Sequence, residues 1–189
     1  MNGRLVVHGD PEIMSGTLVF VGTDVEIEVR LATSADAAAV AAILAEVDAW
    51  VAQLGTPMWE LGEVDQGRVA TEVATGLFAL AWCGEPAGTV RFQLEDAEFW
   101  PDRPDDRAAY IHRLAVRRMF AGRGVSTALM TWAVERARAL GRDVLRLDCD
   151  ADRRSLRAVY ERFGFTYHSD RQVGPYFVAR YEMPLTRRT

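Results

Sequence analysis

The stretch that decides the fold covers residues 109–165 and reads AYIHRLAVRRMFAGRGVSTALMTWAVERARALGRDVLRLDCDADRRSLRAVYERFGF. It begins with an apolar run typical of a strand and continues into a short loop that carries Gly122 and Gly124. An amphipathic pattern predicts a long helix directly after this loop, then a second strand and a second helix that stops at Gly164. Because the first N–H groups of a helix have no partner within it, the glycine loop predicts an anion site.

The remaining elements extend this unit on both sides. Apolar periodicity, turn residues and capping residues predict strand 25–31, helix 37–54, helix 64–75, strands 77–83 and 88–94, an acidic loop at 99–107, strand 109–117, helix 123–140, strand 143–149, helix 153–163, and strands 165–170 and 176–184. Antiparallel strands around one central βαβ unit predict an α+β fold with a mixed, mostly antiparallel sheet. Residues 1–25 differ in composition, and we expect an N-terminal extension or hairpin in front of a domain that spans residues 26–189.

The composition is that of a soluble protein with one full core. The chain has 189 residues, of which 49% are hydrophobic, and its net charge is −5. No apolar stretch is long enough to cross a membrane, and the N-terminus lacks the pattern of a signal peptide. Cys83 and Cys149 lie in apolar runs without the spacing of a disulfide or metal site, so we expect buried thiols, no metal site and a cytoplasmic location.

Charge is distributed unevenly along the chain. Residues 1–112 carry 6 Arg and 19 acidic residues, whereas residues 113–189 carry 16 Arg and 8 acidic residues. The sequence contains no lysine, so every fixed cation is a guanidinium, which binds phosphates through planar, paired donors. The basic half contains the glycine loop. The acidic half favours a positively charged partner and argues against nucleic acid.

Two glycines one residue apart are weak evidence by themselves, because Gly122 and Gly124 are also compatible with a plain tight turn. A dinucleotide-binding loop needs a third glycine, whose position Ser126 occupies, and an acid at the end of the next strand, where Asp148 lies, so dinucleotide binding is an alternative. The place of this unit behind an antiparallel hairpin argues against that fold. A Walker loop is excluded because the chain has no Gly-Lys-Ser/Thr.

The order of elements over residues 26–185, with the motifs within residues 110–165, resembles the GNAT superfamily of acyl-coenzyme A-dependent N-acyltransferases. The family's phosphate motif is Arg or Gln, two residues, Gly, one residue, then Gly or Ala. Residues 121–126 match it with Gly124 kept, and with Ala121 and Ser126 as departures. The resemblance implies the GNAT fold, a central sheet of six to seven strands with helices on both faces. It also implies acetyl transfer from acetyl-CoA to a primary amine of a small molecule, by direct attack in a ternary complex.

The resemblance further implies where the cofactor binds. The strand before the loop would pair with the pantetheine arm of acetyl-CoA, and the Val116 amide would polarise the thioester carbonyl. The loop and the following helix start would bind the phosphates, and a guanidinium at the start of the second helix would add a contact. The implied cofactor-binding residues are Leu114, Ala115, Val116, Ala121, Gly122, Arg123, Gly124, Val125, Ser126, Thr127 and Arg153.

Three residues are candidates for proton transfer. Tyr160 matches the family tyrosine that protonates the departing thiolate, although an aromatic residue packed under the sheet is the alternative. For the general base the matching position is Tyr110, and His112 shares its face of the strand. An imidazole with a pKa near 6.5 suits a base at neutral pH, and a structural histidine is the alternative. Further candidates that would act through water are Glu95, Asp96 and Glu60.

The acceptor pocket is implied for residues 50–63, WVAQLGTPMWELGE, where the family builds it. Trp59 with Met58 would form an apolar wall, and packing into the core is the alternative for a tryptophan here. Acidic groups would bind the cationic amine, and the residues assigned to the substrate are Trp59, Glu60 and Glu95. An exposed last strand often mediates dimers in this superfamily, which makes a homodimer a candidate assembly.

Residues 8–25, HGDPEIMSGTLVFVGTDV, carry a second resemblance, to the start of a family of small antitoxin-like proteins. The DNA-reading helices of that family do not follow in this chain. Residues 8–25 therefore leave a second class of function open, a non-catalytic acyl-CoA-binding protein or a toxin–antitoxin-type protein.

Overall fold

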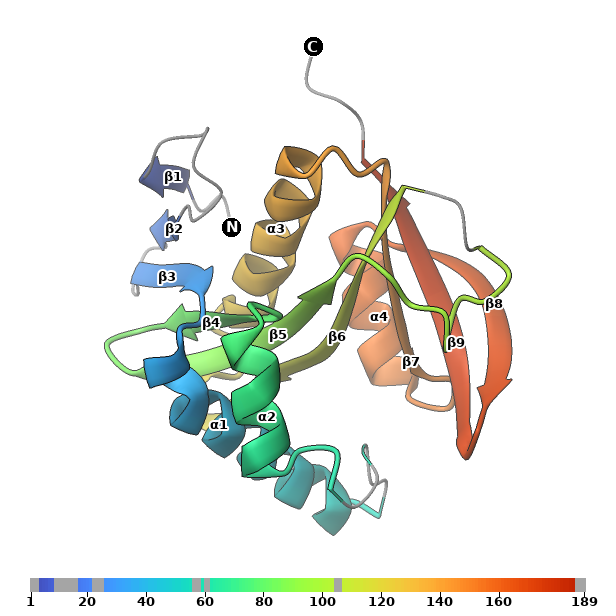
Figure 1. The fold of residues 1–189 in the computed structure, drawn as a ribbon, viewed down its shortest axis with the longest axis horizontal. Helices are drawn as coiled ribbons and strands as arrows, with labels where there is room; N and C mark the ends of the chain where they lie inside the picture. The colour runs from blue at the N-terminus through green and yellow to red at the C-terminus, as the bar shows by residue number, and fades with distance from the viewer. Residues whose placement is uncertain are drawn as a thin grey trace. The chain divides into compact units, whose positions relative to one another are not determined.

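The computed structural model describes residues 4–8, 17–21, 26–55, 59, 62–103 and 107–185 (Figure 1), the first two segments by their backbone only. The chain divides into two compact units. Unit 1 comprises Met1–Arg91 with Arg113–Trp132, and unit 2 comprises Phe92–His112 with Ala133–Thr189. Strand β6 (Ala108–Val116) and helix α3 (Val125–Ala139) therefore contribute residues to both units.

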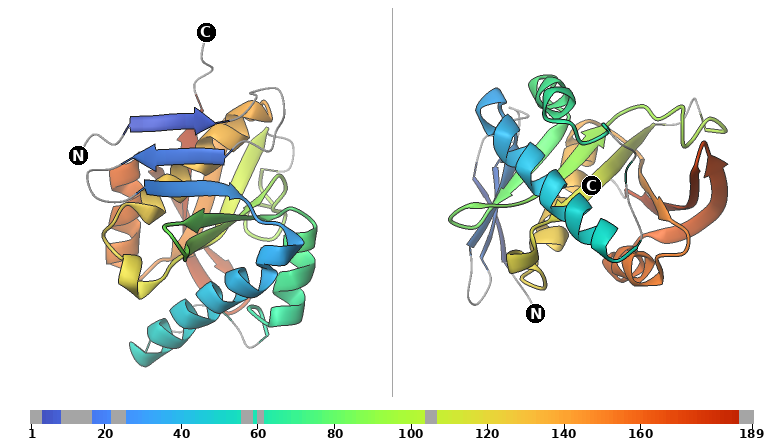
Figure 2. Two further views of the ribbon diagram at one scale, coloured as in Figure 1. Left: turned by 90° about the vertical axis from the view of Figure 1, so that its left-hand side faces the viewer. Right: turned by 90° about the horizontal axis from the view of Figure 1, so that it is seen from below.

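Unit 1 contains antiparallel strands, each of which pairs with the next strand along the chain. Its strands are β1 (Arg4–His8), β2 (Thr17–Val21), β3 (Glu26–Leu31), β4 (Phe78–Trp82) and β5 (Pro86–Gln93). The three blue strands β1, β2 and β3 lie side by side in the left view of Figure 2. The N-terminal residues thus form a hairpin that pairs with β3. The domain boundary at residue 25 stays a prediction.

Two helices supply the core of unit 1, α1 (Ala37–Gln53) and α2 (Gln66–Ala74). The buried positions of α1 recur every three or four residues, which is the spacing of one helix face. They pack with buried residues of α2 and β4 into one apolar cluster that also contains Ala115 of β6. A short 3-10 helix, Ser34–Asp36, leads into α1, and its Asp36 carboxylate binds Arg30 of β3 at 2.7 and 2.9 Å.

Unit 2 contains the first part of β6 with β7 (Val144–Asp150), α4 (Arg154–Phe163), β8 (Thr166–Val173) and β9 (Tyr176–Pro184). The strand order is β6-β7-β9-β8, in which β6 and β7 are parallel and the other pairs are antiparallel. The buried ring of Trp100 is flanked by the guanidinium groups of Arg146 and Arg180, each 4.6 Å from its centroid. These contacts explain why two arginines are tolerated in the interior of this unit.

The predicted α+β class with a mixed sheet is confirmed, and the strands β3 to β9 are the seven that the sequence predicts. Predicted element ends agree with the structure within two residues, except that β8 extends three residues beyond its predicted end. No helix in the described ranges has both the length and the hydrophobicity to cross a membrane. Both thiols are free. Cys149 is buried as expected, whereas Cys83 is partly exposed. The cytoplasmic location stays a prediction.

Candidate functional site

The glycine loop opens directly into α3. Gly122 and Gly124 have φ of 76° and 88°, the left-handed region that favours glycine. The first backward hydrogen bond of the helix runs from Ala128 N to Gly124 O at 2.9 Å, so the amides of residues 125–127 precede it. The Val125 side chain is buried beneath the loop, whereas residues 121–124 are exposed. This arrangement fits a phosphate group, because N–H donors at a helix start lie beside an exposed loop.

Hydrogen bonds within unit 1 hold the segment that leads into this loop. Arg117 N donates to Ala87 O at 2.9 Å, which ties the end of β6 to β5. Glu46 of α1 accepts from Arg117 Nε at 2.7 Å and from the Arg118 amide at 3.1 Å. The hydrogen bond from Arg117 lowers the pKa of Glu46, so this carboxylate is ionised at neutral pH. Glu46 is a supporting residue that the sequence patterns did not single out.

Strand β6 departs from regular geometry just before the predicted pantetheine-binding residues. Arg113 has a φ of 49°, a left-handed conformation that is uncommon for a side chain with a Cβ. Its guanidinium pairs with Glu72 of α2 at 2.7 Å, and Arg91 of β5 approaches the same carboxylate at 3.8 Å. The strained residue is therefore held by an ion pair that is largely shielded from water, beside the backbone of residues 114–116.

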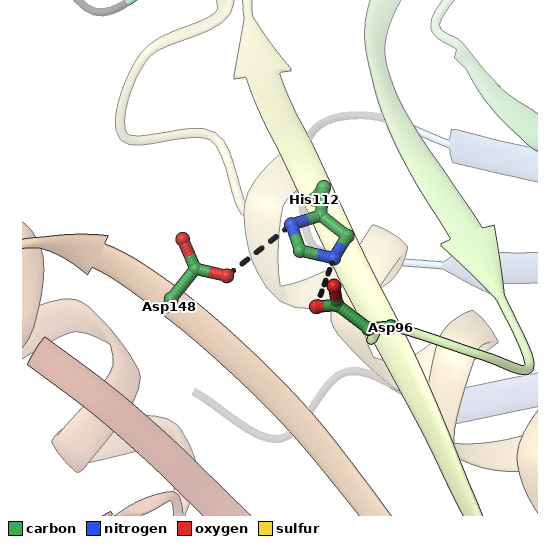
Figure 3. A group of neighbouring side chains, drawn as sticks. All are labelled: Asp96, His112 and Asp148. Atoms are coloured by element: carbon green, nitrogen blue, oxygen red, sulfur yellow. Dashed lines mark ion pairs between the residues drawn. The ribbon is translucent and has the colours of Figure 1, made fainter. Parts of the chain in front are cut away.

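In unit 2 the structure brings together His112, Asp96 and Asp148 (Figure 3). His112 Nε2 lies 3.0 Å from Asp96 Oδ2, and His112 Nδ1 lies 3.3 Å from Asp148 Oδ1. Their side chains are only 13%, 4% and 11% exposed, respectively. We call this group the carboxylate clamp. Nε2 and both facing oxygens are shielded from solvent and make no hydrogen bond of good angle with any residue that the structure describes, so they interact chiefly through charge.

The clamp changes the acid–base behaviour that we expected of His112. Burial by itself would lower the pKa of His112, but the charges of Asp148 and then Asp96 outweigh it and raise the pKa to about 9. The expectation of a pKa near 6.5 is therefore wrong in this environment. The ring is mainly an imidazolium at neutral pH. A base role for His112 would develop only in alkaline solution.

The clamp residues come from three separate segments. Parallel pairing of Ile111 with Leu147 places the next residues, His112 and Asp148, beside each other on β6 and β7. Asp96 follows β5, and its other oxygen accepts the Phe99 amide at 3.1 Å. Asp148 appeared in the sequence only as a strand end, whereas Asp96 was one of several acidic candidates.

The spacing of the clamp is compatible with a cation, since one ligand atom of each residue lies within 4.8 Å of the others. The two carboxylates, however, face different nitrogens of one ring. An ion bound at Nε2 would therefore contact Asp96 but leave Asp148 on the opposite nitrogen, with only two protein groups as ligands. The arrangement fits a charged imidazole between two carboxylates better than a bound metal ion.

Tyr160 of α4 is buried, with 5% of its surface exposed. Its ring packs against Phe165 and Tyr181, with centroid distances of 6.2 and 6.3 Å. Burial raises the pKa of Tyr160 above its ordinary value of 10, so the phenol keeps its proton at neutral pH. The residue can act as a proton donor, and it also has the packing role that the sequence left open.

Other predicted site residues lie in varied environments. Tyr110 is buried in the core of unit 2, where Arg146 Nη1 donates to its hydroxyl at 3.4 Å. Arg153 precedes α4, and its shielded Nη1 makes no hydrogen bond with the part of the chain that the structure describes, which leaves a donor for an anion. Trp59 packs against the core cluster of unit 1, and Glu95 is exposed. The predicted pocket residues Met58 and Glu60 lie outside the described residues.

Comparison with known proteins identifies the family. A sequence profile of the acetyltransferase (GNAT) family matches residues 44–165, more than half of the chain. The chain belongs to the GNAT acetyltransferase family. Among curated proteins it is similar to the uncharacterized N-acetyltransferase YesJ of Bacillus subtilis, with 28% identity over 139 residues that cover 70% of this chain and 77% of YesJ.

Solved structures share the fold of this family member. A GNAT acetyltransferase from Listeria monocytogenes aligns with a TM-score of 0.75 at 22% identity, over 88% of this chain and 99% of that chain. The acetyltransferase yncA of Salmonella typhimurium, solved with acetyl-CoA, aligns with a TM-score of 0.65 at 17% identity, over 86% and 96% of the two chains. Family membership confirms the predicted GNAT fold, the enzyme class and acetyl-CoA as the co-substrate. The antitoxin-like resemblance of residues 8–25 stays a prediction.

Proposed function

We propose that this acetyltransferase transfers the acetyl group of acetyl-CoA to a primary amine of a small molecule, by direct attack of the amine in a ternary complex. The observation that carries the proposal is the exposed glycine loop whose left-handed residues open into the start of α3. Amides at such a helix start suit the diphosphate of coenzyme A. The departures at Ala121 and Ser126 affect side chains, whereas the phosphate contacts come from the backbone.

Each catalytic group has a defined task in this proposal. The Val116 amide donates to the thioester carbonyl and stabilises the negative charge that develops there during attack. Tyr160 donates its proton to the departing thiolate, which has an ordinary pKa of about 8.5 and leaves more readily when protonated. His112 accepts the proton that the attacking amine must lose.

The acceptor is a cationic amine before it reacts, and acidic residues in the first half of the chain would attract it. In the proposal Trp59 provides an apolar surface, while Glu60 and Glu95 bind the charged amine. We further propose that the protein does not bind nucleic acid and that its assembly is a homodimer.

Release of free coenzyme A thiol from acetyl-CoA, measured against a panel of primary amines, tests the proposal. Tyr160→Phe removes only the phenolic proton, and we expect kcat to fall by about 10²-fold or more. Tyr167→Phe is the matched control, because Tyr167 is a half-exposed tyrosine on β8, and it should retain wild-type turnover.

Two results would contradict the proposal. Tight acetyl-CoA binding without turnover on any amine would favour the alternative, a non-catalytic acyl-CoA-binding or toxin–antitoxin-type protein. Equal turnover in Tyr160→Phe and Tyr167→Phe would remove Tyr160 from proton donation and leave it as a packing residue.

A further inference from the structure

The clamp determines which protonation state of His112 is stable. A neutral imidazole carries one N–H and one lone pair, whereas an imidazolium carries two N–H groups. Both ring nitrogens face a carboxylate oxygen, at 3.0 and 3.3 Å. In the neutral ring one carboxylate would therefore face a lone pair, which is repulsive. The geometry selects the imidazolium, whose positive charge lies between two carboxylates.

The two aspartates are placed beside the ring by separate features of the fold. Asp96 is fixed by the Phe99 amide, which donates to its second oxygen at 3.1 Å. Asp148 is fixed by the register of β7, which lies between β6 and β9. The charged groups that act on His112 are Asp148 from β7 and Asp96 from the segment after β5, while the Phe99 ring packs against the imidazole at 5.7 Å and is uncharged. The clamp therefore places two negative charges beside the ring.

We propose that Asp96 and Asp148 are positioning residues that hold His112 as an imidazolium at neutral pH, so that acetyl transfer accelerates only as this ring loses a proton in alkaline solution. The inference rests on the proposed role of His112 as the proton acceptor. In the reaction, the amine nitrogen forms a bond to the acetyl carbon as the carbon–sulfur bond breaks. The amine proton passes to the vacated ring nitrogen, and the proton of Tyr160 passes to the thiolate.

A titration of the imidazole C–H resonances by NMR tests the clamp without any measurement of activity. The chain has three histidines, His8, His112 and His168, and the signal that disappears in His112→Gln assigns the residue. We expect this signal to titrate well above the ordinary pKa of 6.5, and to move down by about one pH unit or more in Asp148→Asn and in Asp96→Asn. Titration of wild-type His112 at or below its ordinary pKa would overturn the inference.

The pH dependence of kcat/KM tests the catalytic consequence. The acceptor in this assay is an aromatic amine, which is neutral from pH 6 to 10, so its own ionisation does not shape the profile. We expect the rate to rise through an alkaline limb in the wild type, and this limb to move toward neutral pH in Asp148→Asn and Asp96→Asn. Asp143→Asn is the matched control, since Asp143 is 51% exposed and lies outside the clamp.

The two measurements separate the possible failures. An alkaline limb at the same pH in all four proteins would overturn the positioning role of the aspartates. If no variant and no wild-type preparation turns over any amine, the proposed function fails, while the NMR titration still decides whether the clamp holds an imidazolium. Should one Asn variant fail to fold, the other variant and the wild-type titration decide the question, because the two aspartates come from different segments.

Discussion

Replacement of Gly124 by alanine tests whether the left-handed loop conformation contributes to binding of acetyl-CoA. The φ of Gly124 is 88°, and a residue with a Cβ loses about 1–2 kcal/mol in the left-handed region. A Cβ at this position would meet Ile27 Cδ1 at 3.8 Å, which is ordinary contact, and no other atom within 4 Å among the described residues. The cost therefore comes from the backbone and not from a clash.

The magnitude of the effect follows from this strain. Because the loop is exposed, the alanine variant can relieve its strain in the free protein by leaving the left-handed conformation. Binding must then restore that conformation, and a cost of about 1–2 kcal/mol lowers the affinity for acetyl-CoA by roughly 5- to 30-fold. Gly76→Ala is the matched control, since Gly76 has a φ of 75° and open space around it, but lies between α2 and β4.

Calorimetric titration of acetyl-CoA into the wild type and both variants measures the affinities, and urea unfolding of the same samples measures stability. We expect weaker binding in Gly124→Ala alone, and for Gly76→Ala a loss of about 1 kcal/mol in unfolding free energy with wild-type affinity. Wild-type affinity in Gly124→Ala would refute the reasoning. An equal loss in both variants would also refute it, because the effect would then be unrelated to the loop.

Three further predictions concern stability. The hydrogen bonds from Arg30 lower the pKa of Asp36, so this pair stabilises the fold above about pH 4. The stabilisation is lost as pH falls through the lowered pKa. Acid unfolding of Asp36→Asn should therefore begin at higher pH than in the wild type. The raised pKa of His112 gives the opposite pH dependence of stability. Its stabilising contribution is complete below pH 6.5 and disappears as pH rises through about 9. The unfolding free energy should therefore decline over this range in the wild type and change less in His112→Gln. Gly88→Ala should destabilise the protein by about 1–3 kcal/mol in urea unfolding, because its Cβ would lie 2.9 Å from a backbone oxygen of β6; an unchanged midpoint would show that β5 can shift away.

Local patterns predicted most of the fold because each element carries its own signal. The face of α1 is visible in the spacing of its buried valines and leucines, and the end of α4 is visible in Gly164. The glycine loop and α3 were likewise located from short-range features. Strand β8 extends to Val173, beyond its predicted end. Half of its residues are exposed, so its sequence carries a weak strand signal, and its pairing with β9 defines its length.

The carboxylate clamp could not be predicted in the same way, because it depends on strand register. Asp96, His112 and Asp148 are separated by 16 and 36 residues, and only the register of β6 against β7 places the last two side by side. The sequence did point to the face of β6 that carries His112. The charge of its neighbours, which sets its pKa, appears only with the tertiary structure.

The ion pairs described above at Asp36, Glu46 and Glu72 all take their positive charge from arginine. A guanidinium keeps its proton at pH values well above those at which a lysine ammonium begins to lose its proton. These pairs therefore persist through the alkaline interval in which His112 titrates. Since the sequence contains no lysine, no side-chain amine of the enzyme competes with the acceptor for the acetyl group in that interval.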